Sequence, residues 1–187
     1  FGVALAHVWP SSLAPEEVGA AVEAARSAAE ALGIQAGPTY TQVVVGPAGA
    51  FVVELAARLG GGHDAELCEA VLGVDLNGLA LAAALGEPVD DEQLRPVEAA
   101  SGGCVRFLVP EPGVLAATEG VEEAEAVQGV EWVRIYRAPG AILGPLRRGS
   151  DRAGAVLATG SSRDEAVERA GRAAGMIRFR TAVQEAV

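Results

Sequence analysis

The chain has 187 residues, of which half are hydrophobic, and it carries a net charge of −11. This length suits one full domain or two small ones, and the apolar fraction allows a substantial core. The acidic balance argues against nucleic acid or an anionic membrane as the main partner. All 14 positively charged residues are arginines, so a Walker A loop, a pyridoxal Schiff base and a biotinylated lysine are excluded.

The beginning of the chain and its two cysteines bear on cellular location. No apolar run reaches the roughly 18 residues of a membrane-spanning helix, and no targeting segment is recognisable. Cys68 and Cys104 lie far apart in sequence and outside any CxxC motif. We therefore expect two buried thiols in a soluble, cytoplasmic protein. Residues 1–6 have the apolar pattern of the interior of a strand and not that of a solvated terminus, which suggests a fragment of a longer chain.

The first third of the sequence predicts a helix followed by a hairpin. Apolar residues recur at helical spacing over residues 15–32, with Pro15 in the first turn and Gly33 at the end. Two apolar β-type runs follow, at residues 39–45 and 51–55. The Gly-Pro-Ala-Gly segment between these runs is typical of a hairpin turn.

The composition of the sequence changes at a glycine-rich loop, residues 56–64. Two helices rich in Ala and Leu are expected next, at about 65–72 and 75–85, and residues 86–92 have the composition of a linker. Beyond the linker, the expected elements are strands at 103–109, 130–136 and 153–159 and a short acidic helix near 121–127. Ser162 and Glu165 form a capping-box pattern that opens a last helix, which ends near residue 177.

The candidate site lies on the hairpin and the loop after it. Glu54 places a carboxylate at the end of an otherwise apolar strand, where a buried charge is costly unless something pairs with it. With the turn centred near residues 47–48, Gln42 lies opposite Glu54, and the Cβ atoms are about 5 Å apart. Arg58 follows four residues later. One carboxylate, one amide oxygen and one guanidinium suit Mg²⁺ with a phosphate; a structural ion pair between Glu54 and Arg58 is the alternative.

The loop itself carries a weaker signal. Consecutive glycines let backbone amides approach a ligand, although ordinary tight loops use them too; the three here are Gly60, Gly61 and Gly62. His63 fits either a substrate-side or phosphate-side role or a solvent-facing loop position. The acids Asp64, Glu66 and Glu69 are explained better by a helix start than by metal ligation. For His7 and Trp9, a packing or capping role is expected rather than catalysis.

These motifs resemble a known superfamily. The segment Glu54-Leu-Ala-Ala-Arg58-Leu-Gly-Gly-Gly-His63 resembles the ATP-grasp signature, in which a strand delivers Glu-x-Asn-x-Arg to the nucleotide site. Residues 37–43 look like the penultimate strand of that family. Residues 7–11 with the helix after them resemble the preceding segment of its amino-acid ligases. Residues 136–140 and 150–166 are similar to the carboxyl-terminal domain of biotin-carboxylase-like enzymes, so the resemblance covers nearly the whole chain.

The resemblance implies an α+β fold in two parts. Residues 1–86 would be the carboxyl-terminal half of an ATP-grasp core, an antiparallel hairpin with helices. Residues 87–187 would be a mixed α/β carboxyl-terminal domain. The implied enzyme is a carboxylate–amine ligase: ATP phosphorylates a carboxylate, and an amine attacks the acyl-phosphate to give an amide.

The resemblance also implies roles for single residues. Glu54 and Gln42 would hold Mg²⁺ with ATP, and Arg58 would stabilise the acyl-phosphate or the tetrahedral intermediate. The loop Gly60, Gly61 and Gly62 would line the acceptor side and, with His63, bind the cofactor. Two positions depart from the family pattern, since Gln42 replaces an acid and Ala56 replaces an asparagine. Both changes should weaken metal binding.

Three alternatives stay open at this point. The first is a biotin carboxylase or a purine-pathway ATP-grasp enzyme. The second, suggested by Gln42 and Ala56, is a non-catalytic relative that binds a ligand or a partner; the third is a soluble α+β interaction domain. The expected partners are ATP and small carboxylate and amine substrates, without nucleic acid or membrane, and a homodimer is left open. We expect this chain alone to be inactive and to bind nucleotide weakly, because it lacks lysine and holds half of a two-part clamp.

Overall fold

The computed structural model describes residues 2–97 and 99–182, and it divides the chain into two compact units. Unit 1 comprises Phe1–Pro10 and Glu98–Val187, and unit 2 comprises Ser11–Val97. The expected division into 1–86 and 87–187 differs from these units at both ends. Strand β1 (Ala6–Trp9) causes the first difference, because it pairs with a strand of unit 1. The expected strand at residues 1–6 is thereby corrected to residues 6–9.

Unit 2 contains the helix and hairpin expected from the sequence. Its elements are α1 (Pro15–Ala31), β2 (Tyr40–Gly46), β3 (Gly49–Ala56), α2 (Asp64–Leu72) and α3 (Leu76–Ala84). Pro15 is the first residue of α1, and the Glu17 carboxylate accepts a hydrogen bond from the backbone N–H of Ala14 at 2.9 Å. This bond satisfies one of the donors that a helix start leaves unpaired. α1 packs against both strands of the hairpin.

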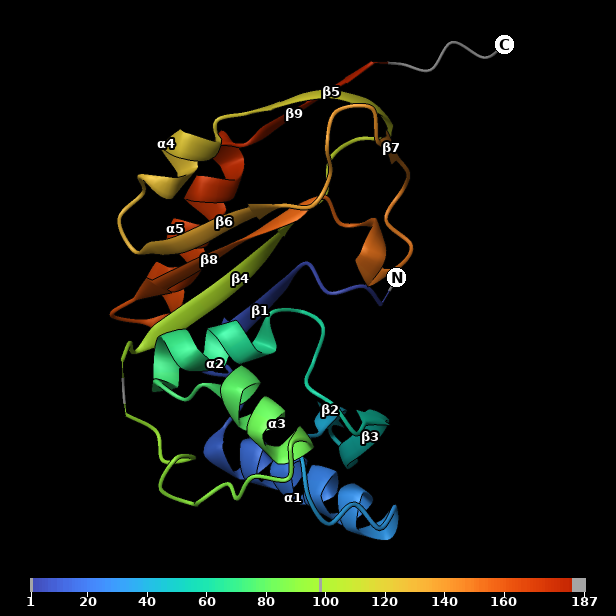
Figure 1. Cartoon of the computed structure of the whole chain (residues 1–187), viewed down its shortest axis with the longest axis vertical. Coiled ribbons are helices and arrows are strands. Elements are labelled where there is room, and N and C mark those ends of the chain that lie inside the picture. Colours follow the sequence, from blue (N-terminus) through green and yellow to red (C-terminus); the bar gives the residue numbers. More distant parts are fainter. Residues whose placement is uncertain (1, 98, 183–187) are drawn as a thin grey trace. The chain divides into compact units, whose positions relative to one another are not determined.

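Unit 1 is built on an antiparallel sheet in the order β1-β4-β8-β6. The new strands of this sheet are β4 (Gly102–Leu108), β6 (Val130–Ile135) and β8 (Gly154–Gly160). A second antiparallel sheet has the order β7-β5-β9, from Ile142–Leu143, Gly113–Glu119 and Arg178–Ala182. The short helix α4 (Val121–Glu125), the 3₁₀ turn η1 (Gly149–Asp151) and the long helix α5 (Arg163–Met176) complete the unit, and α5 lies along β4 and β8 (Figure 1). Antiparallel sheets with helices confirm the α+β class.

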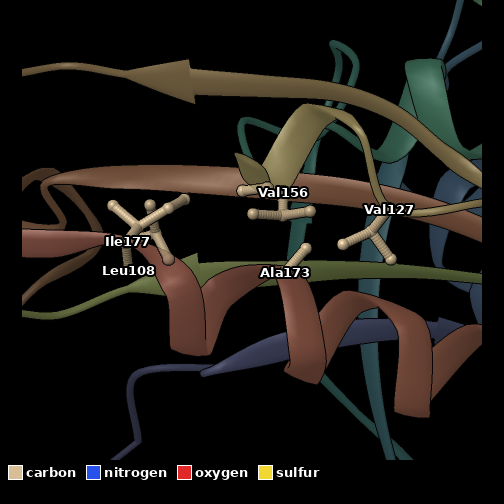
Figure 2. Packing of buried hydrophobic residues seen from close by; sticks show 6 residues of the cluster. Leu108, Val127, Val156, Ala173 and Ile177 are labelled. Carbon is tan, nitrogen blue, oxygen red and sulfur yellow. The ribbon is translucent and has the colours of Figure 1, made fainter. Parts of the chain in front are cut away.

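The core of unit 1 lies between α5 and the first sheet. Ala166, Ala170 and Ala173 are fully buried at helical spacing, and their small side chains let the helix approach the strands closely. Larger apolar side chains pack around Ala173, as Figure 2 shows. That cluster comprises Leu108, Ala124, Val127, Val156, Ala173 and Ile177.

The start of α5 follows the predicted cap in part. The Ser162 side chain accepts a hydrogen bond from the Glu165 N–H at 3.2 Å. The Glu165 carboxylate accepts from the N–H of Ser161 at 2.7 Å, one residue before the position that a capping box uses. Both side chains of the cap therefore accept a backbone N–H at the helix start, but Glu165 binds the N–H of Ser161 in place of that of Ser162.

One helix pair in the described part of the chain has the length and composition of a membrane span. Among the described residues, no single helix is long and apolar enough to cross a membrane. α2 and α3 taken together reach that length and composition, with a bend of 120° between them.

Candidate functional site

Gln42 and Glu54 are direct partners across the hairpin. The register of β2 and β3 pairs Gln42 with Glu54, and a bulge follows immediately, between Gln42 and Val43. Directly opposed residues of antiparallel strands present their side chains on the same face. The expected juxtaposition is confirmed, and so is the two-residue turn at Pro47 and Ala48.

The face that carries this pair is exposed. Val44 pairs with Phe51 on the same face, and their exposed fractions are 54% and 56%. We call these four residues, Gln42, Val44, Phe51 and Glu54, the open face of the hairpin. The expectation that Glu54 ends a buried strand is wrong, because no residue of β3 is buried. The cost of a buried charge therefore gives no reason for Glu54 to have a partner.

Arg58 lies two residues beyond the end of β3 and is exposed. Its Nη1 donates a hydrogen bond to the Leu59 carbonyl oxygen at 2.8 Å. Within the described part of the chain, Arg58 forms no ion pair with Glu54, so the structural-pair alternative is not supported. This contact with the neighbouring carbonyl uses one end of the guanidinium fork.

The glycine loop is tightly organised around the side chain of Asp64. The Gly62 N–H donates to the Asp64 carboxylate at 3.3 Å, and Gly62 is buried. A side chain at Gly60 would overlap the same carboxylate, whereas one at Gly61 would meet nothing within 4 Å. Two glycines of the loop are thus enclosed and the middle one is open.

His63 occupies a strained position at the start of α2. Its φ of 61° is in the left-handed region, which is uncommon for a residue with a side chain. Its Nδ1 lies 3.0 Å from the Glu66 Oε1, and its side chain is only 17% exposed. Of the two alternatives left open for His63, the solvent-facing loop position is not supported. A role toward substrate or phosphate stays a prediction.

Acids at the start of α2 do not assemble a metal cluster. Asp64 and Glu66 belong to the first turn of that helix, as expected. In residues 2–97 and 99–182, no group of three or more His, Cys, Asp or Glu side chains is placed to hold a metal ion. The only oxygen donors that the sequence analysis assigned to a metal are those of Gln42 and Glu54.

The two cysteines, His7 and Trp9 are the remaining residues that the sequence singled out. Cys104 is buried and Cys68 is half-buried, both are free thiols, and burial raises the pKa of each. The His7 ring packs edge-on against Phe107 with 5.3 Å between ring centroids, which confirms its packing role. Trp9 is 41% exposed in β1, so the packing expected for it is at most partial.

The contact between Asp64 and the loop was not predicted from the sequence. Asp64 was expected only as an acid of the helix start, since an acid in a first turn already has an explanation. No spacing rule marked it, because local side-chain acceptors commonly bind an N–H that follows them in the chain, whereas Asp64 accepts from the N–H of the earlier Gly62.

The fold matches that of the carboxyl-terminal part of ATP-grasp ligases. The L-amino acid ligase from Bacillus licheniformis superposes with a TM-score of 0.84 and 24% identity over 97% of this chain and 45% of that protein. Phosphoribosylglycinamide synthetase from Anaerococcus prevotii gives 0.82 and 14% over 96% and 46%. The biotin carboxylase domain of the Hydrogenobacter thermophilus 2-oxoglutarate carboxylase, whose structure is a dimer with MgADP and bicarbonate, gives 0.69 and 16% over 95% and 39%.

Within that class, residues 106–182 match the family described as L-amino acid ligase C-terminal domain 2. The uncharacterized protein y4rH of Sinorhizobium fredii is 32% identical over 162 residues, which are 84% of this chain and 32% of that protein. The resemblance to the carboxyl-terminal half of ATP-grasp ligases is confirmed. The chain spans less than half the length of each of these relatives.

Proposed function

We propose that this chain forms the metal- and phosphate-facing half of an ATP-dependent ligase that joins a carboxylate to an amine. The open face of the hairpin carries the proposal. Glu54 and Gln42 are directly opposed there, Arg58 and the glycine loop follow in sequence, and the fold is shared with ATP-grasp ligases. A cytoplasmic location and small-molecule partners, rather than nucleic acid or membrane, belong to the same proposal.

The donor set suits magnesium. Mg²⁺ takes oxygen ligands and is commonly held by one or two carboxylates together with substrate phosphates. Glu54 supplies one carboxylate, and Gln42 supplies an amide oxygen on the same exposed face. When bound, the ion would neutralise charge on the phosphate oxygens during transfer.

The residues around the pair suit the rest of a nucleotide and its reaction. Val44 and Phe51 offer an exposed apolar surface on the same face, where a flat base can pack. Arg58 can turn its remaining N–H groups toward two oxygens of a transferring phosphoryl group or of the intermediate. Positive charge placed there stabilises the negative charge that develops in the transition state.

The proposed reaction forms one amide bond for each ATP. A carboxylate oxygen attacks the terminal phosphorus of ATP, and ADP leaves. The amine nitrogen then attacks the acyl carbon, loses a proton, and inorganic phosphate leaves. The dimer of the Hydrogenobacter thermophilus enzyme supports testing a homodimer here as well.

The test is release of ADP by the whole protein, measured with a panel of amino acids as carboxylate and as amine. We expect release that depends on both substrates and on Mg²⁺. Glu54→Gln should raise the Mg²⁺ concentration needed for half-maximal rate by roughly 10–100-fold, because a charged ligand is lost. Glu23→Gln, an exposed acid of α1, is the matched control and should change nothing.

A non-catalytic relative is the second candidate, favoured by two substitutions. Gln42 stands where the superfamily has an acid, and Ala56, which pairs with Tyr40 at the end of the hairpin, stands where it has an asparagine. Nucleotide binding without any substrate-dependent ADP release would select this candidate over the ligase.

A further inference from the structure

We infer that Asp64 is a positioning residue that holds the glycine loop in the shape the ligase site uses. This inference rests on the proposed function, which assigns the loop to the acceptor side of the site. Asp64 has no assigned role in the reaction beyond its place in the first turn of α2. Its carboxylate nevertheless turns back from the helix toward the loop that precedes it.

The first observation is a hydrogen bond across the loop. The Gly62 N–H donates to the Asp64 Oδ2 at 3.3 Å, and Gly62 is buried. A buried backbone N–H needs a partner, and here a carboxylate supplies it. The bond fixes the loop two residues before the helix, where otherwise three successive glycines would leave the backbone with wide conformational freedom.

The second observation is the space around Gly60. A Cβ atom built there would overlap the Oδ2 and Cγ atoms of Asp64 and would lie 2.6 Å from Cδ2 of Tyr40. The φ of Gly60 is outside the left-handed region, so contact and not backbone conformation requires glycine. Asp64 thus fills the place that a side chain at Gly60 would need.

The close contact at Gly60 does not extend to the next glycine, Gly61. A Cβ atom at Gly61 would meet nothing within 4 Å, and the residue is exposed. Asp64 therefore accepts from the Gly62 N–H on one flank of the loop, occupies the side-chain space of Gly60 on the other, and leaves the middle residue open. A carboxylate at the start of a helix is also favoured by the helix dipole, so the position supports an ionised acceptor.

The first test measures how strongly Asp64 holds the loop. Amide hydrogen exchange of residues 60–62 in the whole protein should accelerate about tenfold in Asp64→Ala, because one hydrogen bond is lost. Asp64→Asn keeps an acceptor oxygen and should restore most of the protection. Asp164→Ala removes an exposed first-turn acid of α5 and controls for a general helix-start effect. Equal exchange in Asp64→Ala and the parent would overturn the inference.

A double-variant cycle tests the steric part. Gly60→Ala should accelerate loop exchange and lower the melting temperature, whereas Gly61→Ala should leave both unchanged. Adding Asp64→Ala to Gly60→Ala removes one of the two overlapping neighbours, so the pair should be less damaging than the sum of the single changes. Strict additivity would mean that Asp64 does not shape the space at Gly60.

The activity measurement separates positioning from folding. In Asp64→Ala the KM for the acceptor amine should rise about tenfold, while the KM for ATP stays within about twofold of the parent. Asp64→Asn should recover the acceptor KM, and Asp164→Ala should match the parent. A parallel loss toward ATP and acceptor would indicate general damage and contradict the positioning role. If the parent releases no ADP, the proposed function fails, and the exchange experiment alone decides whether Asp64 holds the loop.

Discussion

The two units of this chain distribute burial in opposite ways. In β8 of unit 1, every residue but Thr159 is buried, and α5 covers one side of the sheet with small side chains. In β3 of unit 2, no residue is buried, and the side chains of the open face meet solvent. Stability is thus concentrated where no chemistry is proposed, and the proposed chemistry lies on strands that contribute little apolar burial.

This difference predicts that substitutions in the two units have separable effects. Core changes in unit 1 should reduce the free energy of unfolding, since close-packed interiors respond to the loss of single methylene groups. Changes on the open face and at Arg58 should alter binding or turnover with little effect on folding, because exposed positions away from special features usually contribute less than about 0.5 kcal/mol.

The largest effect is expected for Arg58→Ala in the whole protein. Turnover should fall about 10²–10³-fold, or roughly 3–4 kcal/mol, because a preorganised donor to developing negative charge is removed. The melting temperature should stay close to that of the parent, since Arg58 is exposed and, within residues 2–97 and 99–182, its side chain donates only to the Leu59 carbonyl oxygen. Steady-state ADP release and thermal melting are measured on the same samples.

Arg58→Lys sharpens the same comparison. Lysine keeps the charge but not the paired donors, so it should recover only a small part of the lost rate. A large fall in melting temperature with turnover per folded molecule intact would show that Arg58 has a structural role and not a catalytic one.

In unit 1, Leu157→Ala should lower the free energy of unfolding by about 3 kcal/mol. Leu157 is 2% exposed in the central strand β8, and truncation leaves a cavity there. Val44→Ala on the open face should cost less than about 0.5 kcal/mol. Denaturant titration of both variants tests the contrast, and equal costs would refute the division between a stabilising unit and an exposed one.

A smaller effect is expected at the start of α5. Ser162→Ala removes the acceptor for the Glu165 N–H and should cost about 1 kcal/mol. Ser27→Ala, on the exposed surface of α1, is the control; it should be neutral or slightly stabilising because alanine is the better helix former. Loss of stability in Ser27→Ala equal to that in Ser162→Ala would show that the cap contributes nothing.

The smallest effect concerns acid sensitivity at the same helix. Hydrogen bonds from the Ser161 hydroxyl and N–H, with the nearby Arg169 guanidinium, hold the pKa of Glu165 below its ordinary value of 4.5. A depressed pKa stabilises the fold above pH 4.5, and that contribution is lost as the pH falls through the lower, folded-state pKa. Glu165→Gln should therefore show a shallower loss of stability below pH 4.5 and an unchanged slope near pH 7. Melting curves over pH 3–7 measure both slopes, and identical acid profiles would contradict this assignment.

Local signals predicted a large part of the fold. Helical periodicity with Pro15 gave α1 to within a residue, and the turn residues fixed the hairpin register that opposes Gln42 and Glu54. Longer-range pairing was not predictable in this way. β7 has only two residues, too few to show a periodic pattern. The pairing of β1 with β4 joins segments about a hundred positions apart, and local periodicity does not reveal such a pairing. β9 alternates charged and less exposed residues and could have been found by that pattern.

The candidate site was predictable in its residue types but not in its burial. Phe51 and its apolar neighbours suggested a buried strand around Glu54, whereas that face of the hairpin is exposed. Sequence alone does not tell which face of a two-sided apolar strand another element covers. The left-handed backbone of His63 and the turned-back carboxylate of Asp64 depend on how the loop closes onto α2, which spacing does not encode.

The pairing of β1 with β4 has a consequence for how this molecule can vary. Trp9 lies opposite Gly103, and unit 2 is the excursion of the chain between these neighbouring strands. The two strands of unit 1 between which this excursion runs therefore lie one strand spacing apart, about 5 Å, where Trp9 faces Gly103. Unit 2 can therefore be lengthened, shortened or replaced without breaking the pairing of β1 with β4. Unit 1 can thus act as a constant frame, while unit 2, which carries the open face and the glycine loop, is the part free to diversify.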